Sequence, residues 1–166
     1  MRNDKIKKIT LIALLSALAL IFSYIESLVS LGFIFPGFKI GISNITVLVV
    51  LYLLGEKYAV PFGLCKSFFS LLFLGRLSSL CFSVCGMAMS LFIMILLRKT
   101  KKFSIFAVSA CGSVFHIWGQ FFAAAVVFSS FSLLRMMPYL SLLAVVSGII
   151  VAAISLPVLS RLDKIG

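Results

Sequence analysis

Six long apolar runs, separated by short polar stretches, make up most of this 166-residue chain. Because crossing the apolar layer of a bilayer takes about 20 helical residues, the length allows at most about six or seven crossings and leaves no room for a soluble catalytic domain. We therefore expect an all-α polytopic membrane protein with six transmembrane helices, forming a single integral membrane domain over residues 1–166. The six runs cover residues 9–29, 45–54, 59–74, 79–97, 105–128 and 139–159.

Composition supports the same class. A chain that is 63% hydrophobic has too much apolar side-chain surface for one small water-soluble core. The first run follows a basic start, is longer than a signal-peptide core and lacks a convincing small-x-small cleavage site. We expect it to remain as the first helix.

The second run, 45–54, is short for a full crossing. Either its helix begins near Gly41, or the segment before it enters the protein as irregular backbone. Irregular backbone is tolerated at membrane depth only where protein or a cavity covers it.

Basic residues are distributed unevenly between the two sides that six crossings would define. The chain has 15 Lys and Arg against 4 Asp and Glu, which in an apolar sequence indicates membrane orientation and no nucleic-acid partner. Because basic loops stay cytoplasmic, we expect a multi-pass protein of the plasma membrane with both termini in the cytoplasm. On that side would lie Arg2, Lys5, Lys7, Lys8, Lys57, Arg98, Lys99, Lys101, Lys102, Arg161 and Lys164, with Lys39, Arg76 and Arg135 opposite.

The acidic residues and the cysteines argue against an enzyme. The four acids are scattered, so no carboxylate cluster for Mg²⁺ is expected, and the chain has no Walker phosphate loop. The cysteines sit in apolar stretches without a Cys-x-x-Cys, and we interpret them as small buried hydrophobic residues. We expect no catalytic residue, metal or cofactor. The residues in question are Asp4, Glu26, Glu56 and Asp163, and Cys65, Cys81, Cys85 and Cys111.

Ionisable groups at membrane depth mark the candidate binding residues, because burying them is costly unless they are paired or hydrated. Lys39, Arg76 and Arg135 occupy the three non-cytoplasmic connections. A cavity lined in this way would favour an anionic ligand such as a carboxylate or phosphate. The alternative is that each of the three reaches to lipid headgroups.

Two further positions lie deeper. Lys66 is about seven residues into its run and either binds ligand or pairs with Glu26 near the outer end of the first helix. Gly112, His116 and Gln120 share a helical face, being spaced four residues apart. His116 either contacts ligand or makes a hydrogen bond between helices.

Two polar motifs carry a family resemblance: Lys39-Ile40-Gly41-Ile42-Ser43-Asn44 and His116-x-x-Gly119-Gln120. With them, over most of its length, the chain resembles the Gx transporter family, often labelled heptaprenyl diphosphate synthase component I. That family is similar to the S components of energy-coupling factor transporters, which are six-helix substrate-binding subunits.

The resemblance implies a function and a set of partners. It implies an S-component-like bundle that binds a small anionic, isoprenoid, quinone-precursor or vitamin-like ligand and works with a transmembrane coupling subunit and two cytosolic ATPases. An Ala-x-x-x-Ala face on the first helix, here Ala13 and Ala17, would contact the coupling subunit. The alternative is a noncatalytic membrane accessory subunit of a heptaprenyl diphosphate synthase. The ligand-binding set is expected to comprise Lys39, Gly41, Asn44, Lys66, Arg76, His116, Gln120 and Arg135.

Overall fold

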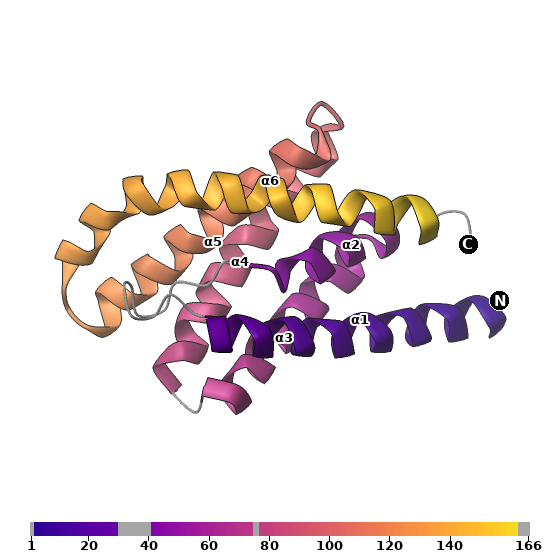
Figure 1. The fold of residues 1–166 in the computed structure, drawn as a ribbon, viewed down its shortest axis with the longest axis horizontal. Helices are drawn as coiled ribbons and strands as arrows, with labels where there is room; N and C mark the ends of the chain where they lie inside the picture. Colours follow the sequence, from indigo (N-terminus) through magenta and orange to yellow (C-terminus); the bar gives the residue numbers. More distant parts are fainter. Residues whose placement is uncertain (1, 30–40, 75–76, 163–166) are drawn as a thin grey trace.

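The computed structural model describes residues 2–29, 41–74 and 77–162, and side chains at 5–26, 41–69 and 80–162. These residues form six α-helices and one 3-10 helix, and no strand occurs among them. The helices make an elongated bundle in which α1 and α6 run along the long axis (Figure 1). The elements are α1 (Arg2–Val29), α2 (Asn44–Leu54), α3 (Glu56–Leu74), α4 (Leu77–Thr100), α5 (Ile105–Val127), η2 (Phe131–Met136) and α6 (Met137–Leu162).

Each apolar run becomes one helix, and most helices extend beyond their run at one or both ends. Among the described residues, four helical stretches are long and apolar enough to cross a membrane: Lys5–Glu26, Leu80–Thr100, Ile105–Val127 and Phe131–Leu162. The helix α2 is apolar but shorter. The structure thus supports an all-helical protein with four membrane spans, and crossings by α2 and α3 stay a prediction.

The short helix α2 lies at the centre of the bundle. It packs against α1, α3 and α6, and its residues from Ile45 to Leu51 are all buried. A helix that is apolar on every side is stable only when other helices surround it. The helix α2 begins at Asn44, three residues after Gly41. The turn 41–43 before it is half-buried at Gly41 and Ile42 and buried at Ser43, so the structure has features of both sequence-based alternatives.

Small residues let neighbouring helices approach closely. A Cβ on Gly119 of α5 would lie 2.6 Å from the carbonyl oxygen of Cys85 in α4, and one on Gly148 of α6 would lie 2.6 Å from Ala110 Cα. The hydroxyl of Ser109 then donates to the Gly148 carbonyl at 2.7 Å. Close backbone packing of this kind is a main source of stability between helices in lipid. The glycines on α5 therefore serve helix packing.

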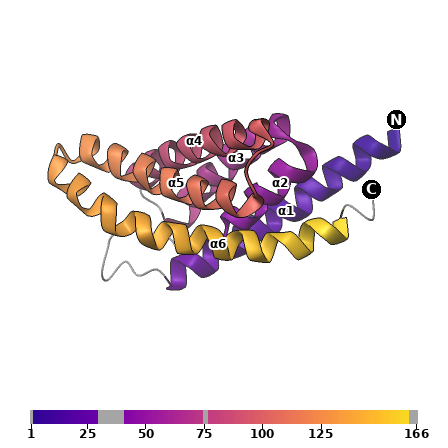
Figure 2. The same ribbon diagram turned by 90° about the horizontal axis from the view of Figure 1, so that it is seen from above.

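The basic residues gather at one end of the bundle. The Lys99 ammonium lies 3.0 Å from the Glu56 carboxylate, which joins the last turn of α4 to the start of α3. Lys8 of α1 lies over the ring of Tyr58, 5.9 Å from its centroid. The start of α1 and the end of α6 lie at the same end of the bundle (Figure 1 and Figure 2). This arrangement agrees with the uneven charge of the sequence.

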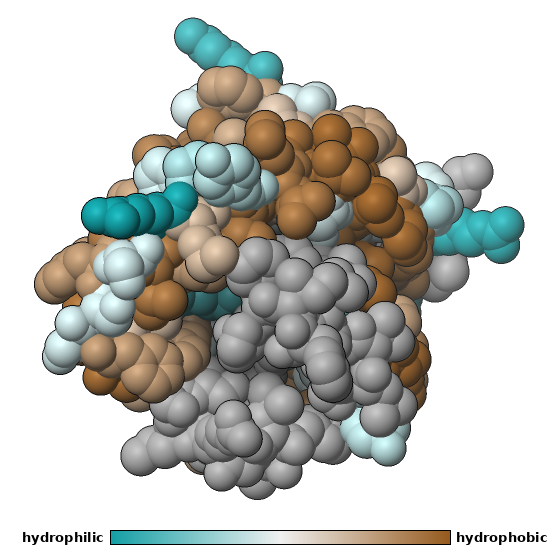
Figure 3. All heavy atoms as spheres, turned by 60° about the vertical axis from the view of Figure 1, so that its left-hand side comes forward, coloured by the Kyte–Doolittle hydropathy of each residue, from teal (hydrophilic) through white to brown (hydrophobic). Residues whose placement is uncertain are grey.

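The outer surface of the bundle is strongly apolar. Leu14 is 61%, Phe92 69% and Leu142 70% exposed, and apolar side chains dominate the described surface when the end opposite the termini is turned forward (Figure 3). Soluble monomers rarely expose so much apolar surface. The expectation of buried cysteines is wrong for three of the four, because lipid accepts an apolar side chain as readily as the core does. Exposed on this surface are Cys65, Cys81 and Cys85, and Cys111 is half-buried.

Candidate ligand-binding pocket

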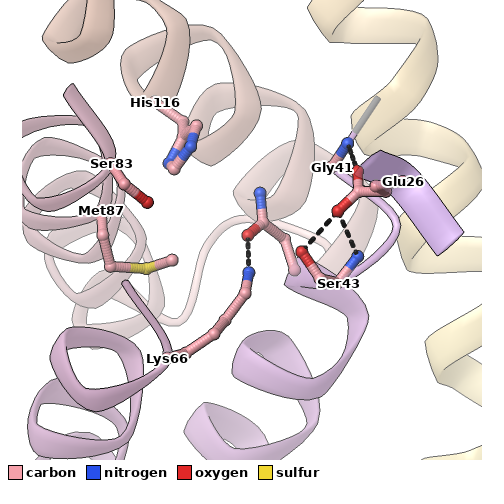
Figure 4. A pocket seen from close by; sticks show the side chains of 8 residues that line it. Glu26, Gly41, Ser43, Lys66, Ser83, Met87 and His116 are labelled. Carbon is pink, nitrogen blue, oxygen red and sulfur yellow. Dashed lines mark hydrogen bonds between the residues drawn. The ribbon is translucent and has the colours of Figure 1, made fainter. Parts of the chain in front are cut away.

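Five helices contribute to a polar pocket in the half of the bundle where α1 ends and α2 begins (Figure 4). The space that remains open to a water-sized molecule is about 10 Å³, about enough for a single water. A buried cluster of polar groups between apolar helices is costly to assemble and therefore marks a candidate functional site. The pocket is lined by Glu26, Gly41, Ser43, Asn44, Lys66, Ser83, Met87 and His116.

The carboxylate of Glu26 binds the turn that leads into α2. It accepts hydrogen bonds from the backbone N–H groups of Gly41, of Ile42 at 2.9 Å and of Ser43 at 3.4 Å. The Ser43 hydroxyl donates to it at 2.7 Å. Gly41 has a φ of 86°, a conformation that residues with a Cβ rarely adopt. This glycine turns three successive N–H groups toward one anion.

Lys66 meets the first residue of α2. Its ammonium donates to Asn44 Oδ1 at 2.6 Å, and the lysine is only 8% exposed. Hydrogen bonds from a charged donor are among the stronger ones in proteins. Glu26 and Lys66 thus line the same pocket, and each has a polar partner on the segment 41–44.

His116 closes another side of the pocket. The side-chain NH₂ of Gln120, one turn further along α5, donates to the His116 Nε2 atom at 3.2 Å, which requires the histidine tautomer without a proton on Nε2. This turn packs on α4, where a Cβ on Gly86 would lie 2.7 Å from the His116 carbonyl oxygen and 3.3 Å from the His116 ring. Backbone packing between α4 and α5 therefore fixes the position of the imidazole.

The structure brings together part of the set that the sequence singled out. Gly41, Asn44, Lys66 and His116 line the pocket, and Gln120 contacts it through His116. Contributions that sequence reasoning missed come from Ser83 and Met87 on α4 and from Glu26 as a lining group.

Of the three other predicted cations, only Arg135 belongs to the described part of the chain. Arg135 is exposed on η2 and is not among the residues that line the pocket. Lys39 and Arg76 lie outside the described residues, so their roles stay predictions. The four-residue spacing of Ser83 and Met87 puts both on one face of α4, but Cys81 and Cys85 have the same spacing, so the spacing does not tell which face points inward.

The predicted docking residues occupy the outer face of the first helix. Ala13 and Ala17 are exposed on α1, next to the exposed Leu14 and Leu18. On the inner face of the same helix, Ala19 is 1% exposed. Within the described residues, the two alanines are thus accessible from outside the bundle.

Comparison with known families identifies the family of this chain. A family model described as heptaprenyl diphosphate synthase component I matches residues 15–157, which include every residue that lines the pocket. The chain belongs to this family. No curated protein and no solved structure is significantly similar to it.

Proposed function

We propose that this member of the family is a membrane-embedded substrate-binding subunit of the S-component type, and that its pocket takes a small anionic ligand. The observation that carries the proposal is the buried ammonium of Lys66, placed with Asn44, Ser83 and His116 around one space. A buried cation with neighbouring donors suits a carboxylate or phosphate group. Isoprenoid, quinone-precursor and vitamin-like anions are the ligand classes to test.

The remaining parts of this function are carried by other proteins. An uptake transporter needs an energy source, and we assign this to a transmembrane coupling subunit and cytosolic ATPases. The exposed Ala13 and Ala17 support docking of the coupling subunit on α1, because small residues let a second helix approach closely in lipid. The basic end of the bundle supports a cytoplasmic position for both termini in the plasma membrane.

The binding proposal is tested by identifying small molecules that copurify with the protein. Mass spectrometry of the wild type should detect an anionic compound that Lys66→Met loses, because the variant removes the ammonium and keeps a side chain of similar length. Lys57→Met on the same helix is the control, since Lys57 is exposed and outside the pocket. Equal recovery of the compound from both variants would exclude Lys66 as its binding partner and contradict the proposal.

The docking proposal is tested by steric blocking. Ala13→Leu combined with Ala17→Leu should prevent copurification of a coupling subunit and its ATPases while leaving the pocket unchanged. Ala153→Leu, at an exposed alanine of α6, controls for a general effect of larger side chains on the lipid-facing surface. Assembly that survives the double substitution would show that docking occurs elsewhere.

A second candidate function is a noncatalytic accessory subunit that holds a soluble prenyl-diphosphate synthase at the membrane. The family description favours it, and the basic end of the bundle would supply the attachment surface. A pull-down separates the two candidates. Recovery of a synthase subunit without a coupling subunit or ATPases favours the accessory role, and the reverse result favours transport.

A further inference from the structure

The pocket is narrow in this structure. Its open space, about 10 Å³, holds about one water molecule, so any larger ligand requires part of the wall to move. The helices α4 and α5 form a rigid part of that wall, because they meet through backbone atoms at Gly86 and Gly119. The opposite wall is different, since the turn 41–43 is irregular backbone before α2.

Glu26 holds this turn against α1. Its carboxylate is 3% exposed and accepts from three backbone N–H groups and one hydroxyl within residues 41–43. A carboxylate can accept hydrogen bonds at both oxygens. The side-chain amide of glutamine accepts at one oxygen only, and its NH₂ group would face the N–H donors of residues 41–43. Few other side chains could hold the turn in this way.

The same contact controls the groups inside the pocket. Asn44 follows the turn directly and accepts the hydrogen bond from Lys66. Its backbone N–H also donates to the Gly41 carbonyl at 2.8 Å, so a shift of the turn moves Asn44 with it. Fixing residues 41–43 therefore fixes the distance between the Asn44 amide and the ammonium of Lys66.

We propose that Glu26 is the positioning residue of this pocket: its carboxylate holds the turn 41–43 in place, which sets Asn44 opposite Lys66, and the pocket opens when this contact breaks. This rests on the proposed function only in taking the pocket as a binding site. The contact is called the Glu26 latch below and comprises Glu26 with residues 41–43.

The latch is tested by the accessibility of the pocket to a small thiol reagent. Ser83→Cys places a single thiol in the pocket wall, in a chain whose four native cysteines are replaced by alanine. Adding Glu26→Gln should raise the rate of alkylation by N-ethylmaleimide at position 83 about tenfold or more, because opening becomes less costly when hydrogen bonds to a charged group are lost. An unchanged rate would overturn the proposal.

A second thiol position separates opening of the pocket from general loosening. Ser90 is 5% exposed and lies two helical turns from Ser83 on the same face of α4. In the matched Ser90→Cys chain, Glu26→Gln should leave the alkylation rate within about twofold of its parent, since distant sites behave independently. A parallel rise at both positions would mean that the whole bundle loosens and would contradict a specific latch.

Two more variants keep the test decisive. Ser43→Ala removes only the hydroxyl contact of 2.7 Å and should raise the rate at position 83 about threefold or more, even if Glu26→Gln does not fold. Glu56→Gln changes a surface carboxylate paired with Lys99 and should change nothing at position 83. A Ser43→Ala rate equal to that of Glu56→Gln would overturn the latch.

The outcome is independent of the ligand. Alkylation requires no bound molecule, so a failed latch leaves the copurification test with Lys66→Met untouched. Conversely, a chain that copurifies with no anion can still show the Glu26-dependent rate at position 83. The two proposals can therefore fail separately.

Discussion

A single added methyl group at Gly119 should be one of the most damaging small changes in this bundle, because α5 packs there directly on the backbone of α4. A Cβ at this position would lie 2.6 Å from the Cys85 carbonyl oxygen and 2.8 Å from Gly86 Cα, whereas ordinary contacts begin at 3.4 Å. Backbone atoms cannot turn aside, so the two helices must separate. Overpacking costs about 1–3 kcal/mol, and the better helix propensity of alanine offsets about 1 kcal/mol.

Gly63 provides the matched control. A Cβ there would also meet close neighbours, 2.8 Å from Leu91 Cδ1 and 3.0 Å from Met87 Sδ. These atoms are the ends of flexible side chains that can move away. Gly63→Ala should therefore be nearly neutral, within about 0.5 kcal/mol of the wild type, because the gain in helix propensity offsets a small repacking cost.

The assay is equilibrium unfolding in mixed detergent micelles, followed by the fluorescence of Trp118, the single tryptophan of the chain. Trp118 lies on α5 and donates to the Ser141 hydroxyl of α6 at 2.8 Å, so its emission should change when the helices part. We expect Gly119→Ala to lose up to about 2 kcal/mol of unfolding free energy and to be less stable than Gly63→Ala. Equal stability of the two variants, or the opposite order, would refute the close packing of α4 on α5.

Three further outcomes follow from local contacts. Ser104→Ala should cost about 1 kcal/mol of unfolding free energy, because the Ser104 hydroxyl caps α5. Glu56→Gln should cost less than about 0.5 kcal/mol, since its pair with Lys99 is exposed, and the same unfolding assay measures both. For orientation, a membrane-impermeant thiol reagent should reach a cysteine replacing Lys102 only from the cytoplasmic side and one replacing Arg135 only from outside. The reverse labelling would invert the charge argument.

Hydropathy located the helices well, for a simple reason. A membrane helix must be apolar over most of its length, so the run 105–128 nearly coincides with α5, Ile105–Val127. The first helix shows where this reasoning stops. The apolar run starts at residue 9 and α1 starts at Arg2, because hydropathy marks the lipid layer, whereas a helix can continue into water.

The direction in which a side chain points was harder to predict. In a soluble protein an apolar residue indicates the core, but in lipid both faces of a helix are apolar. The sequence of α4 therefore could not tell that Cys81 and Cys85 face outward while Ser83 and Met87 line the pocket. Polar residues at depth were more informative, and Asn44, Lys66 and His116 were found in this way.

The role of Glu26 could not be predicted because its partners in the described residues are mainly backbone groups. The charges in the sequence suggested a pair between Glu26 and Lys66. The residue types do not show which backbone N–H groups will bind a carboxylate. From the sequence, Gly41 was considered as a helix start and as part of a binding motif. Its positive φ, which turns the N–H groups of residues 41–43 toward the carboxylate, emerges only from the folded chain.

The length of α2 has a consequence for how such proteins could diversify. Its 11 residues span about 16 Å, roughly half of the 30 Å hydrocarbon thickness, and polar side chains from four other helices line the pocket at its first residue, Asn44. The buried aliphatic residues of α2 thus maintain the architecture, whereas the polar side chains around Asn44 are free to change. Substitutions among the pocket residues could therefore change the polarity of the pocket without repacking the aliphatic residues of α2.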